Sequence, residues 1–161
     1  MNRLLCLVGI GVLGVLASAV VATADRGMYP AEPAGTYMTA VVKQKLRSDY
    51  AAAWQTLYPP HQRVATLDAY VGCESLVPSA GTLLGVRVLH SFDERIRIAG
   101  RKGKLLTRAV KIRVSVASPL YTAWPVSITQ TFHAIAVDGQ WRWILSPDQY
   151  AYYSAGACPY G

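Results

Sequence analysis

The spacing of apolar residues changes once along the chain, near residue 80. Between Thr36 and Tyr58 apolar residues recur every three to four positions, which predicts one long amphipathic helix that ends at Pro59. A second, shorter helix is predicted from Leu67 to about Cys73, with Thr66 as its cap. After residue 80 the period becomes two, so the rest of the chain is predicted to form strands.

The first two strands are predicted over residues 84–98 and 106–116, joined by a turn at residues 100–103. Their apolar residues share one parity and most of their polar residues the other, so each strand is expected to be half buried. Gly103 suits the left-handed position of a three-residue hairpin loop. These segments therefore predict an antiparallel hairpin.

A second hairpin is predicted over residues 122–137 and 140–145, around the two-residue turn Asp138-Gly139. This turn pairs Val137 with Gln140, Ala136 with Trp141, Ala134 with Trp143 and Phe132 with Leu145. Small residues then face the large indoles, so register and polarity agree. The predicted fold class is α+β, with N-terminal helices packed on a curved, four-stranded, mainly antiparallel sheet.

The first 24 residues have the composition of an export signal. Arg3 precedes an apolar run, and Ala22-Thr23-Ala24 forms a cleavage pattern of small residues. An uncleaved membrane anchor over residues 4–24 is the alternative, because about 20 apolar residues can cross a bilayer. Residues 25–35 are expected to be a flexible linker and residues 36–161 a single domain. Both interpretations place the domain outside the cytoplasm, as a secreted or cell-envelope protein.

Two cysteines remain once the signal is removed, Cys73 and Cys158. In an oxidising compartment an even pair predicts a disulfide, and two free buried thiols are the alternative. The chain-entropy model gives about 4 to 5 kcal/mol for closing a loop of this length. The bridge would hold the C-terminal tail against the N-terminal half.

Three segments carry a resemblance to a known family: Trp54-Gln-Thr-Leu-Tyr-Pro-Pro-His-Gln62, Tyr70-Val-Gly-Cys-Glu74 and Asp138-Gly-Gln-Trp-Arg-Trp-Ile-Leu145. They resemble exported bacterial members of the nuclear transport factor 2-like superfamily, the SnoaL-like α+β domains related to the ketosteroid isomerase and dehydratase fold. The resemblance covers about residues 36–160 and implies a cone-like domain with an internal cavity. Because members include enzymes, carriers and interaction domains, it does not imply one function.

If the apolar parity lines such a cavity, the polar residues on that parity are the candidates for its chemistry. Glu94 and Arg108 are expected to pair across neighbouring strands and to orient a polar ligand, or else to be solvated at the hairpin end. His90 is a candidate general base, or a hydrogen-bonded core residue. The candidate ligand-binding residues are Arg108, Gln130, Trp141 and Trp143.

Other features of the sequence speak against catalysis. Catalytic members of the superfamily rely on a carboxylate or a His–carboxylate set inside the cone, whereas Glu94 is the one acid predicted on the inner parity of the strands. His61 is expected in a loop and His133 on the outward parity, so the three histidines do not converge on a metal. The sequence predicts no metal site and no cofactor, and it contains no phosphate loop or nucleophile elbow. It favours a non-catalytic interaction domain, with a small-ligand carrier or an isomerase- or dehydratase-like enzyme as the alternative.

The distribution of basic residues predicts a second candidate surface for binding. The chain is 52% hydrophobic, which excludes intrinsic disorder, and its net charge of +7 falls to +6 when residues 1–24 are removed. Eight basic residues are expected to form one basic face: Arg87, Arg95, Arg97, Arg101, Lys102, Lys104, Lys111 and Arg113. Such a face favours anionic partners, or is a solvated surface that prevents edge aggregation.

The expected partners follow from that charge and from export. Lipid headgroups, wall polymers or an acidic protein surface are expected, whereas nucleic acid is not, because no exposed aromatics are interleaved with the cations. Other membrane contact is expected only through residues 4–24 if they stay uncleaved. Monomer and homodimer both stay open.

Overall fold

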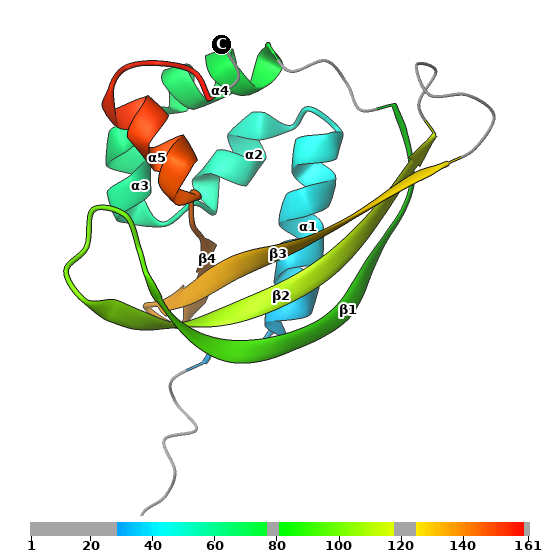
Figure 1. Cartoon of the computed structure of the whole chain (residues 1–161), viewed down its shortest axis with the longest axis horizontal. Helices are drawn as coiled ribbons and strands as arrows, with labels where there is room; N and C mark the ends of the chain where they lie inside the picture. Colours follow the sequence, from blue (N-terminus) through cyan, green and yellow to red (C-terminus); the bar gives the residue numbers. More distant parts are fainter. Residues whose placement is uncertain (1–28, 77–80, 118–124, 160–161) are drawn as a thin grey trace, which may run out of the picture.

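The computed structural model describes residues 29–76, 81–117 and 125–159. Helices precede the strands in it as predicted, but a helix that was not predicted, Pro147–Ser154, follows them. The helices are α1 (Ala34–Leu46), α2 (Tyr50–Gln55), α3 (Pro59–Val64), α4 (Leu67–Ser75) and, after the strands, α5 (Pro147–Ser154). The strands are β1 (Thr82–Arg97), β2 (Lys104–Ala117), β3 (Val126–Val137) and β4 (Gln140–Trp143). They pair antiparallel in the order β1-β2-β3-β4, which confirms the predicted α+β class (Figure 1).

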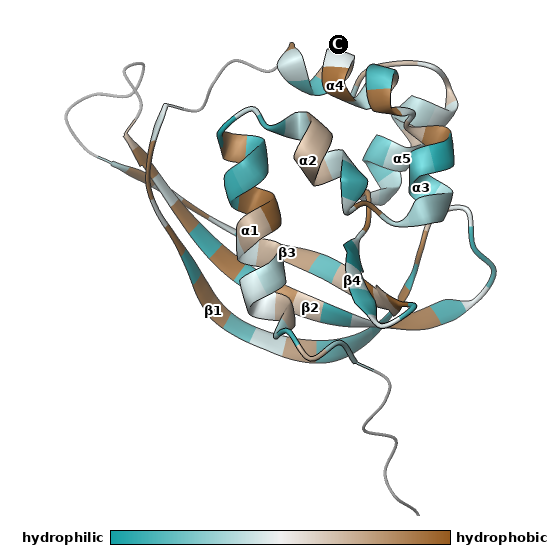
Figure 2. Cartoon of the chain, turned by 180° about the vertical axis from the view of Figure 1, so that it is seen from behind, coloured by the Kyte–Doolittle hydropathy of each residue, from teal (hydrophilic) through white to brown (hydrophobic). Residues whose placement is uncertain are grey.

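The helices of the described chain lie on one side of the sheet, and the sheet curves around α1 (Figure 1). Apolar and polar residues alternate along β1, β2 and β3, as the banding in Figure 2 shows. One face of the sheet can therefore pack against helices while the other stays in water. The core between α1 and the strands includes Met38, Val41, Val110, Ile112, Ala134 and Trp143.

The single long helix predicted from Thr36 to Tyr58 is wrong. The chain breaks at Ser48, whose φ of 60° is left-handed and cannot continue an α-helix. Asp49 then caps α2, because its side chain accepts a hydrogen bond from the backbone N–H of Ala52 at 3.3 Å. Pro59 ends the helical pattern as expected, but it also occupies the first turn of α3, where a missing N–H costs nothing.

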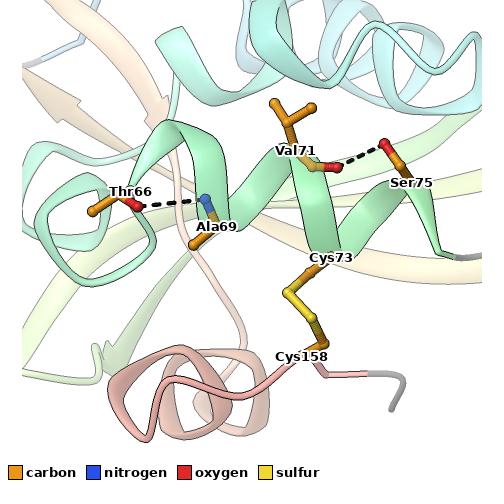
Figure 3. Close-up of a disulfide and its surroundings, with 6 residues drawn as sticks. All are labelled: Thr66, Ala69, Val71, Cys73, Ser75 and Cys158. Carbon is orange, nitrogen blue, oxygen red and sulfur yellow. Dashed lines mark hydrogen bonds between the residues drawn. A yellow bond between two sulfur atoms is a disulfide. The ribbon is translucent and has the colours of Figure 1, made fainter.

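The predicted short helix and its cap are confirmed in α4. Its first residue is Leu67, and the Thr66 side chain accepts a hydrogen bond from the backbone N–H of Ala69 at 3.4 Å (Figure 3). The helix runs to Ser75, two residues beyond the predicted end. The capping hydroxyl replaces a hydrogen bond that the first turn of a helix cannot make internally.

Strand β1 contains two register irregularities that the sequence pattern does not reveal, between Leu83 and Gly85 and between Val88 and His90. Val88 pairs with Ile112, whereas His90 pairs with Lys111, so β1 has one extra residue between these pairs. Successive residues of a strand point to opposite faces, and an extra residue therefore inverts the parity of everything after it. The parity predicted over residues 84–98 is therefore wrong for His90, Phe92 and Glu94, which are exposed, whereas Ile96 is half-buried and Ile98 is buried as predicted.

The register predicted for the second hairpin is confirmed over the length of β4. Ala136 pairs with Trp141 and Ala134 with Trp143 around the Asp138-Gly139 turn. The fourth predicted pair, between Phe132 and Leu145, is absent from the described ladder, because β4 ends at Trp143. Predicted strand residues 122–124 lie outside the described residues.

The backbone N–H of Leu145, which does not join the β3–β4 ladder, is bonded to the side chain of His61. The Leu145 N–H donates to His61 Nδ1 at 3.0 Å, so Nε2 carries the ring proton and donates to the Ala99 carbonyl at 3.1 Å. The imidazole is fully buried and lies in α3 rather than in the predicted loop. Burial lowers the pKa of His61, against the opposing effect of its hydrogen bond to Ala99. His61 thus ties α3 to the β1–β2 turn and to the chain after β4 in its neutral form.

The predicted disulfide joins Cys73 of α4 to Cys158 after α5 (Figure 3). It spans 85 residues of sequence, with the Cα atoms 5.2 Å apart. Tyr153 of α5 is buried in the same core cluster. The bridge and this side chain together hold α5 against the helical layer.

The residues before α1 are held at the sheet rather than separate from it. Tyr29 stacks on Trp141 with the ring centroids 5.3 Å apart, and the Trp141 indole N–H donates to the Glu32 carbonyl at 2.7 Å. Part of the segment expected to be a linker therefore packs on the domain. The predicted export segment lies outside the described residues, among which no helix is long and apolar enough to cross a membrane.

Candidate functional site

A cavity of about 610 Å³ lies between α1, the sheet and the chain that connects β4 to α5. Its walls are mostly aliphatic and aromatic. Side chains that contribute to them include Met38, Val42, Val114, Val116, Phe132 and Trp143. An apolar space of this size is typical of a site that holds a small molecule.

Helix α1 forms one wall of the cavity because of how its residues are spaced. Met38, Val41, Val42, Lys45 and Leu46 line it, at steps of three and four residues that place them on one helix face. The same face meets the core, where Met38, Val41 and Val42 are buried. The cavity is therefore a continuation of the core in which side chains do not fill the space.

The edge of β3 forms the opposite side. β4 pairs with β3 only from Ala134 to Val137, so the preceding part of β3 has no strand beside it on that edge in the described chain. Ile128 and Gln130 line the cavity here, and Ile128 is 56% exposed. A smaller polar hollow shares Gln130 with α5 residues Gln149 and Tyr152. The exposed Ile128 beside polar side chains indicates that the cavity opens to solvent at this edge of β3.

Lys45 brings a positive charge to the apolar wall. Its Nζ lies 3.4 Å from Glu74 Oε2 and 5.1 Å from the centroid of the Trp143 ring. The Glu74 side chain is 6% exposed, and its other oxygen has no hydrogen-bond partner among the described residues. Removing Lys45 would leave the buried Glu74 carboxylate uncompensated, which is strongly unfavourable. The ammonium group is therefore held in place beside the cavity.

Trp143 and Gln130 line the cavity, as two of the four predicted ligand-binding residues. The Trp143 indole N–H donates to the Ala53 carbonyl at 2.8 Å, and its backbone N–H donates to the Tyr37 hydroxyl at 2.9 Å. Burial raises the pKa of Tyr37, which keeps this hydroxyl neutral. These bonds fix the ring plane that faces the cavity.

Trp141 and Arg108, the other two predicted residues, belong to a different cluster. Arg108 Nη1 donates to Asp93 Oδ1 at 2.8 Å, and the Tyr29 hydroxyl donates to the same oxygen at 2.9 Å. The Arg108 hydrogen bond holds the pKa of Asp93 below its usual range. Glu94, the partner expected for Arg108, lies on the opposite parity because of the irregularity before His90.

His90 and Glu94 do not face the cavity, contrary to expectation. His90 pairs with Lys111 on the face of the sheet that helices do not cover, and it is exposed. Glu94 Oε2 lies 2.9 Å from His133 Nε2, with the two side chains 44% and 24% exposed. His133 has the predicted outward parity, although it also borders the cavity at the β3 edge. The extra residue in β1 is the physical reason for both corrections.

The same irregularity divides the predicted basic face. Arg87, Lys111 and Arg113 share the uncovered face, whereas Arg95 and Arg97 have the opposite parity. All of the predicted basic residues except the half-buried Lys111 are exposed. Arg97 also borders the cavity. The eight cations therefore form a group on the uncovered face and a second group around the hairpin turn.

The sequence did not predict that Lys45 pairs with Glu74 or that the His61 side chain is buried. A signal for Lys45 was present, because it stands three and four residues after Val42 and Val41, on the face that packs inward. No comparable signal marks His61, whose partners Ala99 and Leu145 are far away in sequence. Within the described ranges, no group of His, Cys, Asp and Glu residues could hold a metal.

No family model matches the chain, and no curated protein matches it. The geometry of the cavity and of the sheet therefore carries the functional argument.

Proposed function

We propose that the protein is a non-catalytic binding domain that holds a small amphipathic ligand, mostly apolar with one acidic end, in the cavity beside α1. The observation that carries this proposal is the cavity itself, about 610 Å³ in volume with a mostly apolar wall. Ligand sites typically range from about 300 to 1,000 Å³ and combine apolar walls with a few polar groups. Protein interiors are otherwise close-packed, so a ligand in this space would gain dispersion contacts with its apolar walls.

The charges around the cavity support an acidic end on the ligand. Lys45 and Arg97 line it and none of the described lining residues is Asp or Glu, although Glu74, beside the cavity, already compensates the charge of Lys45. Cations at the wall of an apolar site attract an anionic group more strongly than they would in water. A carboxylate on an aliphatic body has both features.

The position of the histidines supports binding rather than catalysis. His90 is on the other face of the sheet. His133 borders the cavity at the β3 edge, but its partner Glu94 does not line the cavity, and the pair is partly exposed to water. General acid–base catalysis needs a positioned group within hydrogen-bond reach of the substrate, in a site from which water is excluded. An isomerase- or dehydratase-like activity is the alternative function, and fewer observations of the cavity support it.

We also propose that the domain acts outside the cytoplasm and is of the nuclear transport factor 2-like, cone-like type. Support for export comes from the apolar segment at residues 4–24 and from the Cys73–Cys158 disulfide, since disulfides persist in oxidising compartments. Support for the family comes from α1 lying in the curve of a four-stranded sheet beside an apolar cavity.

Calorimetric titration with decanoate and decanol tests the cavity. Decanoate is expected to bind, and more tightly than decanol if the acidic end is recognised by the wall cations. Val114→Trp, which places an indole in the cavity, is expected to weaken binding at least tenfold. Ser115→Trp is the matched control, because residue 115 lies next in the strand but on the uncovered face.

A second variant separates the acidic end from the apolar body. Lys45→Met and Arg97→Met remove the cations, and Glu74→Gln is added so that no buried carboxylate loses its partner. This variant is expected to bind decanoate and decanol alike. If Val114→Trp and the unaltered protein bound decanoate equally well, or neither ligand bound, the cavity proposal would be wrong.

A further inference from the structure

The face of the sheet turned away from the helices carries an ordered set of cations and hydroxyls. Arg87, Arg113 and Thr129 are aligned across β1, β2 and β3, and His90, Lys111 and Thr131 are aligned in the next row on the same face. We call these six residues the basic patch. Neighbouring strands are about 5 Å apart and same-face residues about 7 Å apart along a strand, so the patch places its groups within a small area.

Like charges lie opposite each other in this patch, which lowers the stability of the protein when no anion is bound. Arg87 is directly opposite Arg113, and like charges in that position repel. None of the patch cations takes part in a salt bridge within the described part of the chain, where the three pairs are Lys45–Glu74, Arg108–Asp93 and His133–Glu94. An external anion would remove the repulsion that the fold leaves uncompensated.

The neighbouring residues extend the patch along the strands. Ser115 and Ser127 follow Arg113 and Thr129, and their hydroxyls hydrogen-bond at 2.8 Å. Towards the hairpin turn, Glu94 and its partner His133 occupy the same face, and Lys104 has the opposite parity, so the exposed cations Arg101, Lys102 and Lys104 form a separate group. The patch itself crosses three strands in two rows, which gives positions for more than one anionic group.

We infer that the basic patch binds a linear anionic polymer whose charges are phosphate groups. Arginine recognises phosphate in a bidentate way, and threonine hydroxyls donate to phosphate oxygens. A phosphate placed between Arg87 and Arg113 offsets their mutual repulsion, and a second phosphate of the same polymer can reach Lys111 in the next row. Apart from Thr131, which also borders the cavity at the β3 edge, the patch lies on the face of the sheet away from the cavity, and the inference does not depend on a cavity ligand.

Two other anionic partners fit the patch less well. A bilayer is flat, whereas this sheet is curved, and the patch contains no aromatic or aliphatic side chain that could enter a membrane interface (Figure 1). Single-stranded nucleic acid is held by bases stacked on aromatic side chains. The exposed aromatic next to the patch, Phe92, is already stacked on His90 with ring centroids 5.6 Å apart.

Titration of the whole protein with inorganic polyphosphate of defined length tests the inference. The patch variant combines Arg87→Gln, Lys111→Gln and Arg113→Gln. The matched control combines Lys43→Gln, Arg47→Gln and Arg63→Gln, three exposed cations in or just after the helices, so both proteins lose the same charge. The patch variant is expected to bind at least tenfold more weakly and the control less than threefold.

Salt dependence gives a second readout. The slope of log affinity against log salt is expected to fall by about 2 to 3 in the patch variant, because each neutralised phosphate contributes about 0.7 to 0.9. The patch variant is expected to keep its fold, with an unfolding midpoint equal to or above that of the unaltered protein, since substitution removes repulsion. Its binding of decanoate is expected to be unchanged.

Several results would overturn the inference. An equal loss of affinity in both variants would mean that net charge alone attracts the polymer. Absence of polyphosphate binding at low salt would remove the site. Tighter binding to phosphatidylglycerol vesicles or to oligothymidine, at equal phosphate concentration and sensitive to the patch variant, would assign the patch to a membrane or to nucleic acid instead.

Discussion

From Val110 to Val116, successive residues of β2 point to two faces of opposite chemistry. Val110 and Ile112 are fully buried against the helical layer, whereas Lys111 and Arg113 point to the uncovered face. Strand geometry alone produces this separation, because alternate side chains point to opposite sides. A thin sheet therefore allows two surfaces to be altered separately, an apolar one that faces the helices and a cationic one that faces away from them.

The strongest test of that independence is loss of the disulfide. Replacing Cys73 and Cys158 together by Ser is expected to lower the free energy of unfolding by about 4 kcal/mol, within the range of about 2 to 5 kcal/mol for such bridges. The effect should reach the covered side, because α5 and the chain before it border the cavity. Urea unfolding measures the loss, and reduction of the unaltered protein should reproduce it.

Polyphosphate binding by the same double variant checks the other side. It should be unchanged under conditions where the variant is still folded, because neither cysteine touches the uncovered face. A parallel loss of both properties would contradict the separation of the two faces.

Neighbouring substitutions in β2 compare the faces directly. Ile112→Ala is expected to destabilise the protein by about 3 kcal/mol, because it removes a fully buried side chain and leaves a cavity in the core. Arg113→Ala, one residue away, is expected to change stability by no more than about 0.5 kcal/mol, or to stabilise slightly by relieving Arg87. Urea unfolding of both variants measures the difference. Similar losses from the two substitutions would show that the uncovered face is packed after all.

A pH change separates a buried histidine from an exposed one. The pKa of His61 is lowered by burial, so the unfolded chain takes up a proton near pH 6.5 that the folded protein resists. Stability from this residue is complete above about pH 6.5 and falls as the pH decreases towards the folded pKa. Between pH 7.5 and 5.5 we expect a loss of about 1 kcal/mol.

Urea unfolding at the two pH values measures this loss, with His90→Gln as the control. His90 is exposed on the uncovered face, so its replacement should leave the pH dependence intact. His61→Leu should flatten it, even if the variant is less stable at every pH. A pH dependence that followed His90 would contradict the assignment.

The smallest expected effect concerns the Asp93–Arg108 pair at the end of the sheet. The Arg108 hydrogen bond lowers the pKa of Asp93, so the stability it adds is present above the carboxyl's ordinary range and is lost as the pH falls through the folded pKa. Both side chains are partly exposed, and Arg108→Gln should cost about 0.5 kcal/mol or less. NMR titration of the Asp93 carboxyl should show its pKa rising in the variant. An unchanged titration would mean that Arg108 is not the cause.

Local sequence signals predicted the elements whose structure depends on neighbouring residues. Asp138-Gly139 specified a turn, and the register of β3 and β4 followed from it pair by pair. Gly103, with a φ of 76°, occupies a left-handed position in the first hairpin turn. The cap at Thr66 and the pairing of Cys73 with Cys158 were also predicted from residue types alone.

The candidate site was predicted less well because it depends on residues that are distant in sequence. One extra residue before His90 moved His90 and Glu94 away from the cavity, and no residue type marks that position. Of the proposed ligand-binding residues, Gln130 and Trp143 line the cavity. Lys45 also lines the cavity, but it was not predicted, because the apolar residues of its helix were the ones that indicated the buried face.

The sequence by itself determined the alternation of polar and apolar residues, the positions of the two hairpin turns and the identity of the cysteine pair. These depend on backbone preferences and residue chemistry over a few positions, or on a count of two. The tertiary structure alone decided which parity faces the helices after residue 88 and how much space remains beside α1. Parity depends on strand pairing, and a cavity is the volume that side chains from separate elements fail to fill, so both arise only when distant segments meet.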